Sequence, residues 1–316
     1  MEYRKLGYTN IQVSAFSLGS WNTFEFMSET DGLQVIQAAV AGGINFLDDA
    51  RYDDKSGKAP IKTGYSEVVF GNLLRAGKFK RDDLVISNRL WLEFYPDESF
   101  EAEVDASLKR IGIQFFDLVF CMAPPESITP EQLVDQLAAL VASGKVRYWA
   151  PANWPVELLA QCCAIAVEKG APLPPAAMVP FSINTRAFVE DDAMMTLCRD
   201  YGVSLVASYS LYGGVLTGKY NAPDAGASVR YETKQLQELR ATGILEKVER
   251  FVDFAKQRGH TPAQLAYAYC LRHPQVASVL FGATSVAQVQ ENLLAMPLSK
   301  TLTDADCAEL EAIFPQ

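Results

Sequence analysis

Histidine is nearly absent from this chain of 316 residues, which contains only His260 and His273. Each stands beside a residue that commonly ends a helix, Gly259 before the first and Pro274 after the second. A Ser-His-Asp triad needs a histidine placed by its neighbours, and a metal site of the usual kind needs several. The sequence therefore argues against both, and no metal is expected.

Positive charge is also scarce, because 28 Lys and Arg stand against 38 Asp and Glu, a formal net charge of -10. No local basic cluster offsets this excess. A negative surface repels phosphate backbones and anionic lipid head groups. Neither nucleic acid nor a membrane is expected as a partner.

Long apolar runs are missing as well, since no stretch of about 18 apolar residues is free of charge. Residues 1–5 carry no apolar segment of the kind found in signal peptides. The six cysteines lack C-x-x-C spacing, and a bridge between the adjacent Cys162 and Cys163 would be strained. We expect reduced cysteines and a cytoplasmic protein.

The chain does contain a regular alternation of short β-branched and aromatic runs with segments of helical apolar spacing. Strands are predicted at 14–19, 44–49, 84–90, 116–122, 146–152, 176–182, 203–209 and 277–282. Their starts lie roughly 30 residues apart, the length of one βα unit, with a longer gap before the last. Eight such units predict an α/β fold, a (β/α)8 TIM barrel.

Helix starts agree with this alternation. Candidate caps are Ser28 and Thr30 for a helix at 31–41, Ser66 for 67–76, Thr129 for 131–142 and Thr261 for 263–272. No linker interrupts the chain, so a single domain over 1–316 is predicted, with an N-terminal hairpin. A long irregular loop at 219–245, between strands seven and eight, is typical of a lid or ligand clamp. A mobile insertion without a role is the alternative.

In such a barrel the working residues project from the carboxyl ends of the strands. These ends and their surroundings carry a set of motifs. In order, the motifs are Tyr3-Arg4-Lys5-Leu6-Gly7, Leu18-Gly19-Ser20-Trp21, Gly43-Ile44-Asn45-Phe46-Leu47-Asp48, Ser66-Glu67-Val68-Val69-Phe70-Gly71-Asn72, Gly144-Lys145-Val146-Arg147-Tyr148, Gly213-Gly214-Val215-Leu216-Thr217-Gly218-Lys219-Tyr220 and Gly282 through Asn292. Together they resemble the aldo-keto reductase superfamily, and within it the branch with the beta subunits of voltage-gated potassium channels.

The resemblance implies a barrel that binds NADPH across its mouth and reduces carbonyls with an Asp, Tyr, Lys and His tetrad. In that chemistry a hydride reaches the carbonyl carbon while Tyr gives a proton to the oxygen. Lys lowers the pKa of Tyr, Asp holds Lys, and His orients the oxygen.

The tetrad match is partial. Asp48 falls on the family Asp, whereas the Tyr position is held by Asp53 and Tyr52 stands one position early. Arg89 holds the Lys position and Met122 the His position. Arg89 is expected to pair with Asp48 and to favour tyrosinate, although arginine cannot relay a proton. In the alternative interpretation, the Asp48–Arg89 ion pair only closes the mouth of the barrel, and Met122 is an ordinary core residue.

The adenosine end of the family's cofactor site is well matched. The residues after the last strand lead into a helix whose amino end can hold phosphate. The cofactor-binding residues implied at this end are Leu211, Gly213, Lys219, Arg230, Gly282, Thr284, Gln288, Glu291 and Asn292. A solvated helix face is the alternative for the last three.

The nicotinamide end diverges. Asn153 keeps the family residue for the carboxamide, but Met178 replaces a Gln and Ser208 replaces the stacking aromatic residue, with Tyr209 adjacent. Ser20 and Trp21 complete this half. The expected substrate pocket adds three aromatic residues, Trp91, Trp154 and Phe181.

The favoured hypothesis is therefore an NADP(H)-dependent oxidoreductase acting on a carbonyl or a related small organic or sugar substrate. Tyr52 would be the proton donor, Arg89 its activating cation and Asp48 the residue that orients Arg89. The alternatives are a nucleotide-binding regulatory or scaffold protein with little turnover, and a cofactor-assisted isomerase or epimerase. A homo-oligomer is suggested only by analogy.

Overall fold

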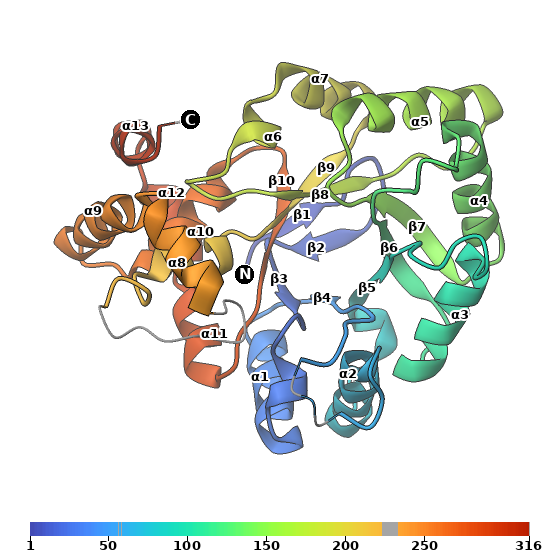
Figure 1. Cartoon of the computed structure of the whole chain (residues 1–316), viewed down its shortest axis with the longest axis horizontal. Coiled ribbons are helices and arrows are strands. Elements are labelled where there is room, and N and C mark those ends of the chain that lie inside the picture. The colour runs from blue at the N-terminus through green and yellow to red at the C-terminus, as the bar shows by residue number, and fades with distance from the viewer. Residues whose placement is uncertain (56, 58, 223–232, 316) are drawn as a thin grey trace.

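The computed structural model describes residues 1–55, 57, 59–222 and 233–315. Eight parallel strands form a barrel, in the spatial order β7-β6-β5-β4-β3-β10-β9-β8 (Figure 1). The strands are β3 (Phe16–Gly19), β4 (Phe46–Asp48), β5 (Val85–Leu90), β6 (Phe116–Cys121), β7 (Val146–Pro151), β8 (Ala176–Pro180), β9 (Ser204–Ser208) and β10 (Val276–Phe281). A bridge between Ala152 and Met178 joins the two outer strands, so the barrel is nearly closed. The predicted (β/α)8 barrel is confirmed.

Helices surround this barrel (Figure 1). Those of the βα units are α1 (Glu29–Ala41), α2 (Tyr65–Gly77), α3 (Phe100–Ile111), α4 (Pro130–Ala142), α5 (Val156–Lys169), α7 (Asp192–Tyr201), α10 (Pro262–Arg272) and α11 (Val286–Leu293). Further helices are α6 (Ala187–Glu190), α8 (Thr233–Ala241), α9 (Ile244–Gln257), α12 (Ala295–Thr301) and α13 (Asp304–Ile313). Within the described part of the chain, none of the helices combines the length and apolar character needed to span a bilayer.

The helix caps follow the sequence with one exception. Ser28, Thr129 and Thr261 each accept a backbone N–H at the start of their helix, as predicted. The helix α2 instead begins after Gly64, whose left-handed backbone (φ 80°) turns the chain. The Ser66 hydroxyl is used differently, because it donates to the carbonyl of Ala50 at 2.6 Å.

The stretch 219–245 is less irregular than predicted. Residues 233–241 form α8, and α9 begins at Ile244. The sequence of α8 is rich in good helix formers, and it buries Leu236 and Leu239, which lie three residues apart on one face. Residues 223–232 lie outside the described part of the chain.

The core has two layers. The barrel interior is filled by side chains such as Phe46, Leu118 and Phe120. The predicted N-terminal hairpin, β1 (Tyr3–Lys5) and β2 (Gln12–Ser14), adds to this interior. Its Leu6 and Val13 are fully buried among the barrel residues, and the hairpin contacts the amino ends of β9 and β10. The functional cavity must therefore lie at the opposite end.

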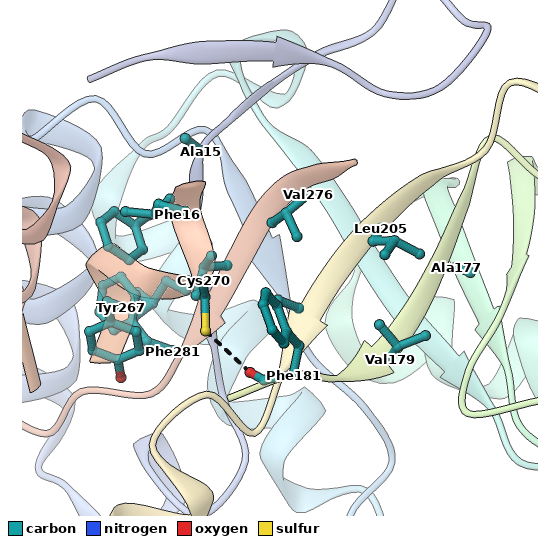
Figure 2. Packing of buried hydrophobic residues seen from close by; sticks show 14 of the residues in the cluster. Ala15, Phe16, Ala177, Val179, Phe181, Leu205, Tyr267, Cys270, Val276 and Phe281 are labelled. Atoms are coloured by element: carbon teal, nitrogen blue, oxygen red, sulfur yellow. Dashed lines mark hydrogen bonds between the residues drawn. The ribbon is translucent and has the colours of Figure 1, made fainter. Parts of the chain in front are cut away.

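The outer layer packs the strands against the helices (Figure 2). Phe16 of β3 is fully buried and meets Tyr267 of α10 and Phe281 of β10 edge to face, with ring centroids 5.6 and 5.4 Å apart. These three side chains join α10 to the sheet. Aromatic pairs of this geometry add to the stabilisation that burial alone provides.

Replacing Phe16 with Ala removes this contact and leaves a cavity. We expect the free energy of unfolding to fall by about 3–5 kcal/mol, measured by urea denaturation. The matched control is Phe26→Ala, at a side chain that is 37% exposed, where the expected change is within about 0.5 kcal/mol. Equal losses in the two variants would contradict this assignment of the core.

Candidate functional site

The strand ends singled out by the sequence meet in one cavity of about 860 Å³ at the carboxyl end of the barrel, a volume typical of ligand pockets. Most expected site residues line it. They are Trp21, Asp48, Tyr52, Arg89, Trp91, Met122, Asn153, Met178, Ser208, Tyr209, Leu211, Gly213, Lys219, Gly282, Thr284, Gln288, Glu291 and Asn292. The cavity wall includes two parts: the β4–β6 wall, formed by Asp48, Tyr52, Arg89, Trp91 and Met122, and the α11 wall, formed by residues within 282–292.

Three expected site residues are not on the cavity wall. Ser20 is buried and donates to Asp49, Trp154 donates to the carbonyl of Met122 at 2.9 Å, and Phe181 packs in the core near His273. Successive side chains point to opposite sides of an extended chain. Trp21 and Pro180 line the cavity, so their neighbours Ser20 and Phe181 face away from it. Trp154 instead follows Asn153, whose backbone is left-handed (φ 59°), and its ring packs on Trp149. Arg230 lies outside the described residues.

A buried ion pair forms the base of the β4–β6 wall. The expected contact between Asp48 and Arg89 is present, with Oδ1 and Nη1 2.5 Å apart and side chains only 2% and 9% exposed. Ser87 donates to the same Asp48 oxygen at 2.5 Å. Burial acts to lower the pKa of Arg89, but Asp48, together with Tyr52 and Asp49, raises it by more. The guanidinium therefore stays charged and fixed in direction.

Tyr52 stands beside this pair on the loop after β4. Its backbone N–H donates to Ala50 and its carbonyl accepts from Gly64, both at 2.9 Å, and its ring meets Trp91 edge to face at 6.0 Å. Arg89 acts to lower the pKa of the Tyr52 phenol, as expected, but it does not set the net direction. Burial raises the pKa of Tyr52 more than Arg89 lowers it, so the pKa is above its ordinary value. Tyr52 is held as a phenol, which can donate a proton.

Met122 completes this wall without a hydrogen-bond donor in its side chain. Its backbone N–H donates to Leu90 at 2.9 Å, and its carbonyl accepts from Trp154. The backbone is thus held on both sides. Met122 supplies apolar surface where a polar donor would orient an oxygen.

The part of the cavity formed by β7, β8 and β9 offers few polar side chains that are available to a ligand. Asn153 adopts a left-handed backbone (φ 59°), which asparagine tolerates, and its side chain is exposed to the cavity. The Ser208 hydroxyl donates a hydrogen bond to the carbonyl of Val179 at 3.1 Å. Tyr209, also left-handed, packs edge to face on Tyr212 at 5.4 Å. An aromatic ring is therefore present next to Ser208.

The α11 wall presents backbone and amide groups. Ser285 caps the helix, and the Thr284 backbone N–H donates to the Gln288 side chain at 2.7 Å. Across the cavity, Gly214 is left-handed (φ 89°), and a Cβ there would lie 3.1 Å from the Lys219 Nζ. A side chain at Gly214 would therefore displace the one Lys on this part of the wall that the structure describes.

Further wall residues were not predicted, namely Asn22, Thr23, Thr217, Thr261 and Tyr267. Asn22 is the most informative, because its buried amide nitrogen has no hydrogen-bond partner among the described residues. The available signal was its position directly after Trp21 at a strand end. Thr261 was noticed only as a helix cap.

Comparison with known proteins decides the family. A model described as "Aldo/keto reductase family" matches residues 15–314. The chain belongs to this family. It is 27% identical over 326 residues to a "Probable voltage-gated potassium channel subunit beta" of Arabidopsis thaliana, covering 99% of the chain and 97% of that protein.

Two further relatives of this aldo/keto reductase family member carry similar descriptions. A rice protein (Oryza sativa subsp. japonica) of the same description is 27% identical over 325 residues, covering 99% of the chain and 96% of that protein. A "Putative voltage-gated potassium channel subunit beta" of Schizosaccharomyces pombe is 28% identical over 328 residues, covering 99% and 93%. The likeness spans the entire barrel in each case.

Behind the site, this family member buries a further acid. Asp49 is fully buried, accepts from Ser20, and its Oδ2 has no partner among the described residues. Burial, together with the nearby Glu67 and Asp48 carboxylates, raises the pKa of Asp49 well above its usual range. Asp49 therefore keeps its proton to a higher pH than an exposed aspartate does.

Replacing Arg89 with Met leaves Asp48 buried without its cation. We expect a loss of about 3–5 kcal/mol in the free energy of unfolding. The control is Lys169→Met, which breaks the surface pair with Asp135, whose side chains are 37% and 61% exposed; the expected loss there is below about 1 kcal/mol. Urea denaturation measures both, and a small loss for Arg89→Met would mean that Asp48 does not depend on it.

Asp49 predicts a pH dependence of stability. In the unfolded chain an aspartate ionises near pH 4, whereas folded Asp49 keeps its proton to higher pH. Asp49 therefore lowers the free energy of unfolding as pH rises above about 4. Asp49→Asn should be more stabilising at about pH 7 than at about pH 4, measured by urea denaturation. Exposed Asp82→Asn controls for the removal of one negative charge, and an equal effect of Asp49→Asn at both pH values would contradict the assignment.

Proposed function

We propose that the protein is an NADP(H)-dependent oxidoreductase acting on a carbonyl or a related small organic or sugar substrate. One observation carries the proposal: a single cavity is lined by both the Asp48–Arg89 pair with Tyr52 and the amino end of α11. A dinucleotide needs an anchor and a reacting end in one continuous space. The family of the chain is an oxidoreductase family, which agrees with this chemistry.

The residues present fit such a cofactor. The amino end of α11 offers backbone N–H groups and Lys219 offers positive charge for phosphate groups. Gln288, Glu291 and Asn292 border the same part of the cavity. The unpartnered amide of Asn22 offers a donor that a ligand would satisfy. When bound, the nicotinamide ring would supply the hydride.

The β4–β6 wall would handle the proton. Tyr52 holds its proton as a phenol and donates it to the substrate oxygen. The fixed charge of Arg89 then stabilises the tyrosinate that remains, and Asp48 keeps Arg89 in place. Arg89 cannot lose a proton itself, so Tyr52 would be reprotonated from solvent.

The substrate end is largely apolar. Trp21, Trp91 and Met122 line it and offer flat or soft surface. A substrate with one polar oxygen near Tyr52 and an apolar or flat body suits these side chains.

A nucleotide-binding regulatory protein with little turnover is a second candidate. Met122 supplies no donor to polarise an oxygen, and the raised pKa of Tyr52 makes it a weaker acid. Three relatives are described as channel beta subunits. This candidate shares the cofactor site and differs in the absence of chemistry.

Titration with NADPH and NADH, followed by their fluorescence, tests binding, and oxidation of NADPH with a panel of aldehydes and ketones tests turnover. We expect tight binding of NADPH and turnover of at least one carbonyl. Tyr52→Phe should reduce kcat by about 10²–10⁴-fold with an unchanged Kd for NADPH, because the α11 wall is untouched.

Tyr3→Phe, in the hairpin at the other end of the barrel, is the matched control and should keep the wild-type rate. Absence of binding to either nucleotide would overturn the proposal. Binding without turnover of any carbonyl would favour the regulatory candidate.

A further inference from the structure

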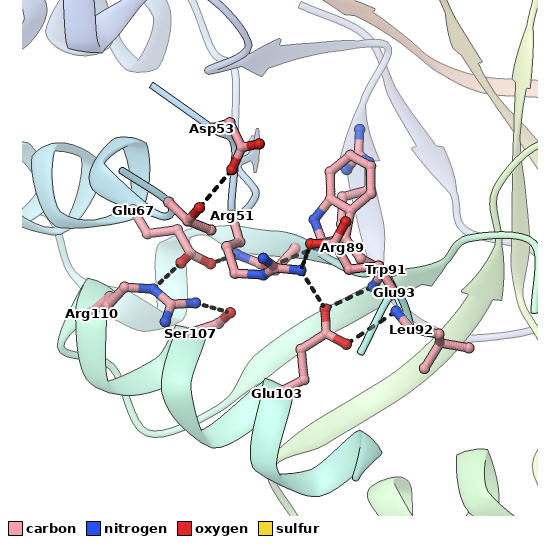
Figure 3. A network of polar contacts seen from close by, with 12 residues as sticks. Arg51, Asp53, Glu67, Arg89, Trp91, Leu92, Glu93, Glu103, Ser107 and Arg110 are labelled. Carbon is pink, nitrogen blue, oxygen red and sulfur yellow. Dashed lines mark hydrogen bonds and ion pairs between the residues drawn. The ribbon is translucent and has the colours of Figure 1, made fainter. Parts of the chain in front are cut away.

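A buried network outside the tetrad positions connects the two loops of the β4–β6 wall (Figure 3). Its central carboxylate is Glu103, in the first turn of α3, whose side chain is only 5% exposed. The Glu103 Oε1 accepts the backbone N–H of Trp91 at 2.8 Å, and Oε2 accepts that of Leu92 at 3.1 Å. One carboxylate thus holds two consecutive amides of the loop after β5.

Arg51 ties the loop after β4 to the same network. Its side chain is only 7% exposed, and Nη2 lies 2.5 Å from Glu93 Oε1 and 3.8 Å from Glu103 Oε1. Figure 3 shows Arg51 lying between the Glu67–Arg110 pair and the two glutamates. Arg51 immediately precedes Tyr52 in the chain, and Glu93 follows Trp91 by two residues. Both loops are therefore fastened next to the residues that they present to the cavity.

The backbone of the second loop needs such a fastening. Leu92 has a positive φ of 61°, a conformation that is unfavourable for a bulky side chain. Such strained conformations persist when the surrounding contacts hold them, and they gather at functional sites. Here the two oxygens of Glu103 hold the amides of Trp91 and of the strained Leu92 itself.

The result of these contacts is the packing of Tyr52 against Trp91. Their rings meet at 6.0 Å with planes 76° apart. Tyr52 lies on the loop that Arg51 holds, and Trp91 lies on the loop that Glu103 holds. The direction of the Tyr52 hydroxyl in the cavity therefore depends on both loops.

We infer that Arg51 and Glu103 are positioning residues that orient Tyr52 for proton transfer by holding Trp91 against it. The inference rests on the proposed function, in which Tyr52 is the proton donor. Neither side chain lines the cavity described above, so they act through Tyr52 and Trp91. A misplacement of about 1 Å at a reacting group can reduce a rate roughly a hundredfold.

The test uses Glu103→Gln, which keeps the size of the side chain but turns an NH₂ group toward an amide that needs an acceptor. We expect kcat to fall roughly ten- to a hundredfold, while the Kd for NADPH stays within a factor of two. Hydrogen exchange should show faster exchange of the Trp91 and Leu92 amides. Glu101→Gln is the matched control: it lies on the same helix and pairs with Lys145 at the surface, and it should change none of these quantities.

A second variant separates positioning from general stability. If Glu103 acts through Tyr52, then Glu103→Gln should cause little further loss of kcat in a Tyr52→Phe background, because coupled residues are not additive. A merely structural role would give the same loss in both backgrounds. Arg51→Lys, which keeps the charge but not the planar fork, should show the same pattern with a smaller loss and covers the case that Glu103→Gln does not fold.

Three outcomes would overturn the inference: a wild-type kcat for Glu103→Gln, additive losses with Tyr52→Phe, or unchanged exchange of the Trp91 and Leu92 amides. Failure of the proposed function looks different, because the wild-type protein itself would then bind no reduced nucleotide or reduce no carbonyl. In that case the exchange measurement decides whether Glu103 holds the loop. Unchanged exchange would again overturn the inference.

Discussion

The site depends on one buried electrostatic contact, in which the Asp48 carboxylate on β4 holds the Arg89 guanidinium on β5. The two strands are paired in register, and Asp48 lies opposite Ser87, which donates to the same carboxylate. A charge removed from water needs a partner of opposite sign. Each member of the pair therefore makes the burial of the other tolerable, and the direction of Arg89 into the cavity follows from it.

The carboxyl groups around this pair lie in different surroundings. Asp48 is paired with Arg89, whereas Asp49, one residue later, has its pKa raised by burial and by the nearby Glu67 carboxylate. Glu103, further out, is held by two backbone amides and by Arg51. The environment, not the residue type, sets which carboxylates act as anions. The β4–β6 wall thus presents the Arg89 guanidinium to the cavity, with its charge balanced by Asp48 behind it.

Much of this arrangement could be predicted from the sequence, because barrel strands bring their carboxyl ends to one edge. That rule placed Asp48, Arg89 and Asn153 around one space. It failed for Phe181, because an error of one residue turns a side chain from the cavity to the core. It failed for Trp154 because the left-handed backbone of Asn153 redirects the chain there. The pKa of Tyr52 could not be predicted either, since the sequence contains the charged neighbours but not the extent of burial. The helix α8 was missed because its apolar positions are few.

The hairpin that covers the amino end of the barrel determines from which side a molecule can reach the cavity. Leu6 and Val13 are buried among the side chains that fill the barrel interior, so a ligand reaches the cavity from the carboxyl end of the strands. A molecule bound nearer this opening would cover one bound deeper in the cavity.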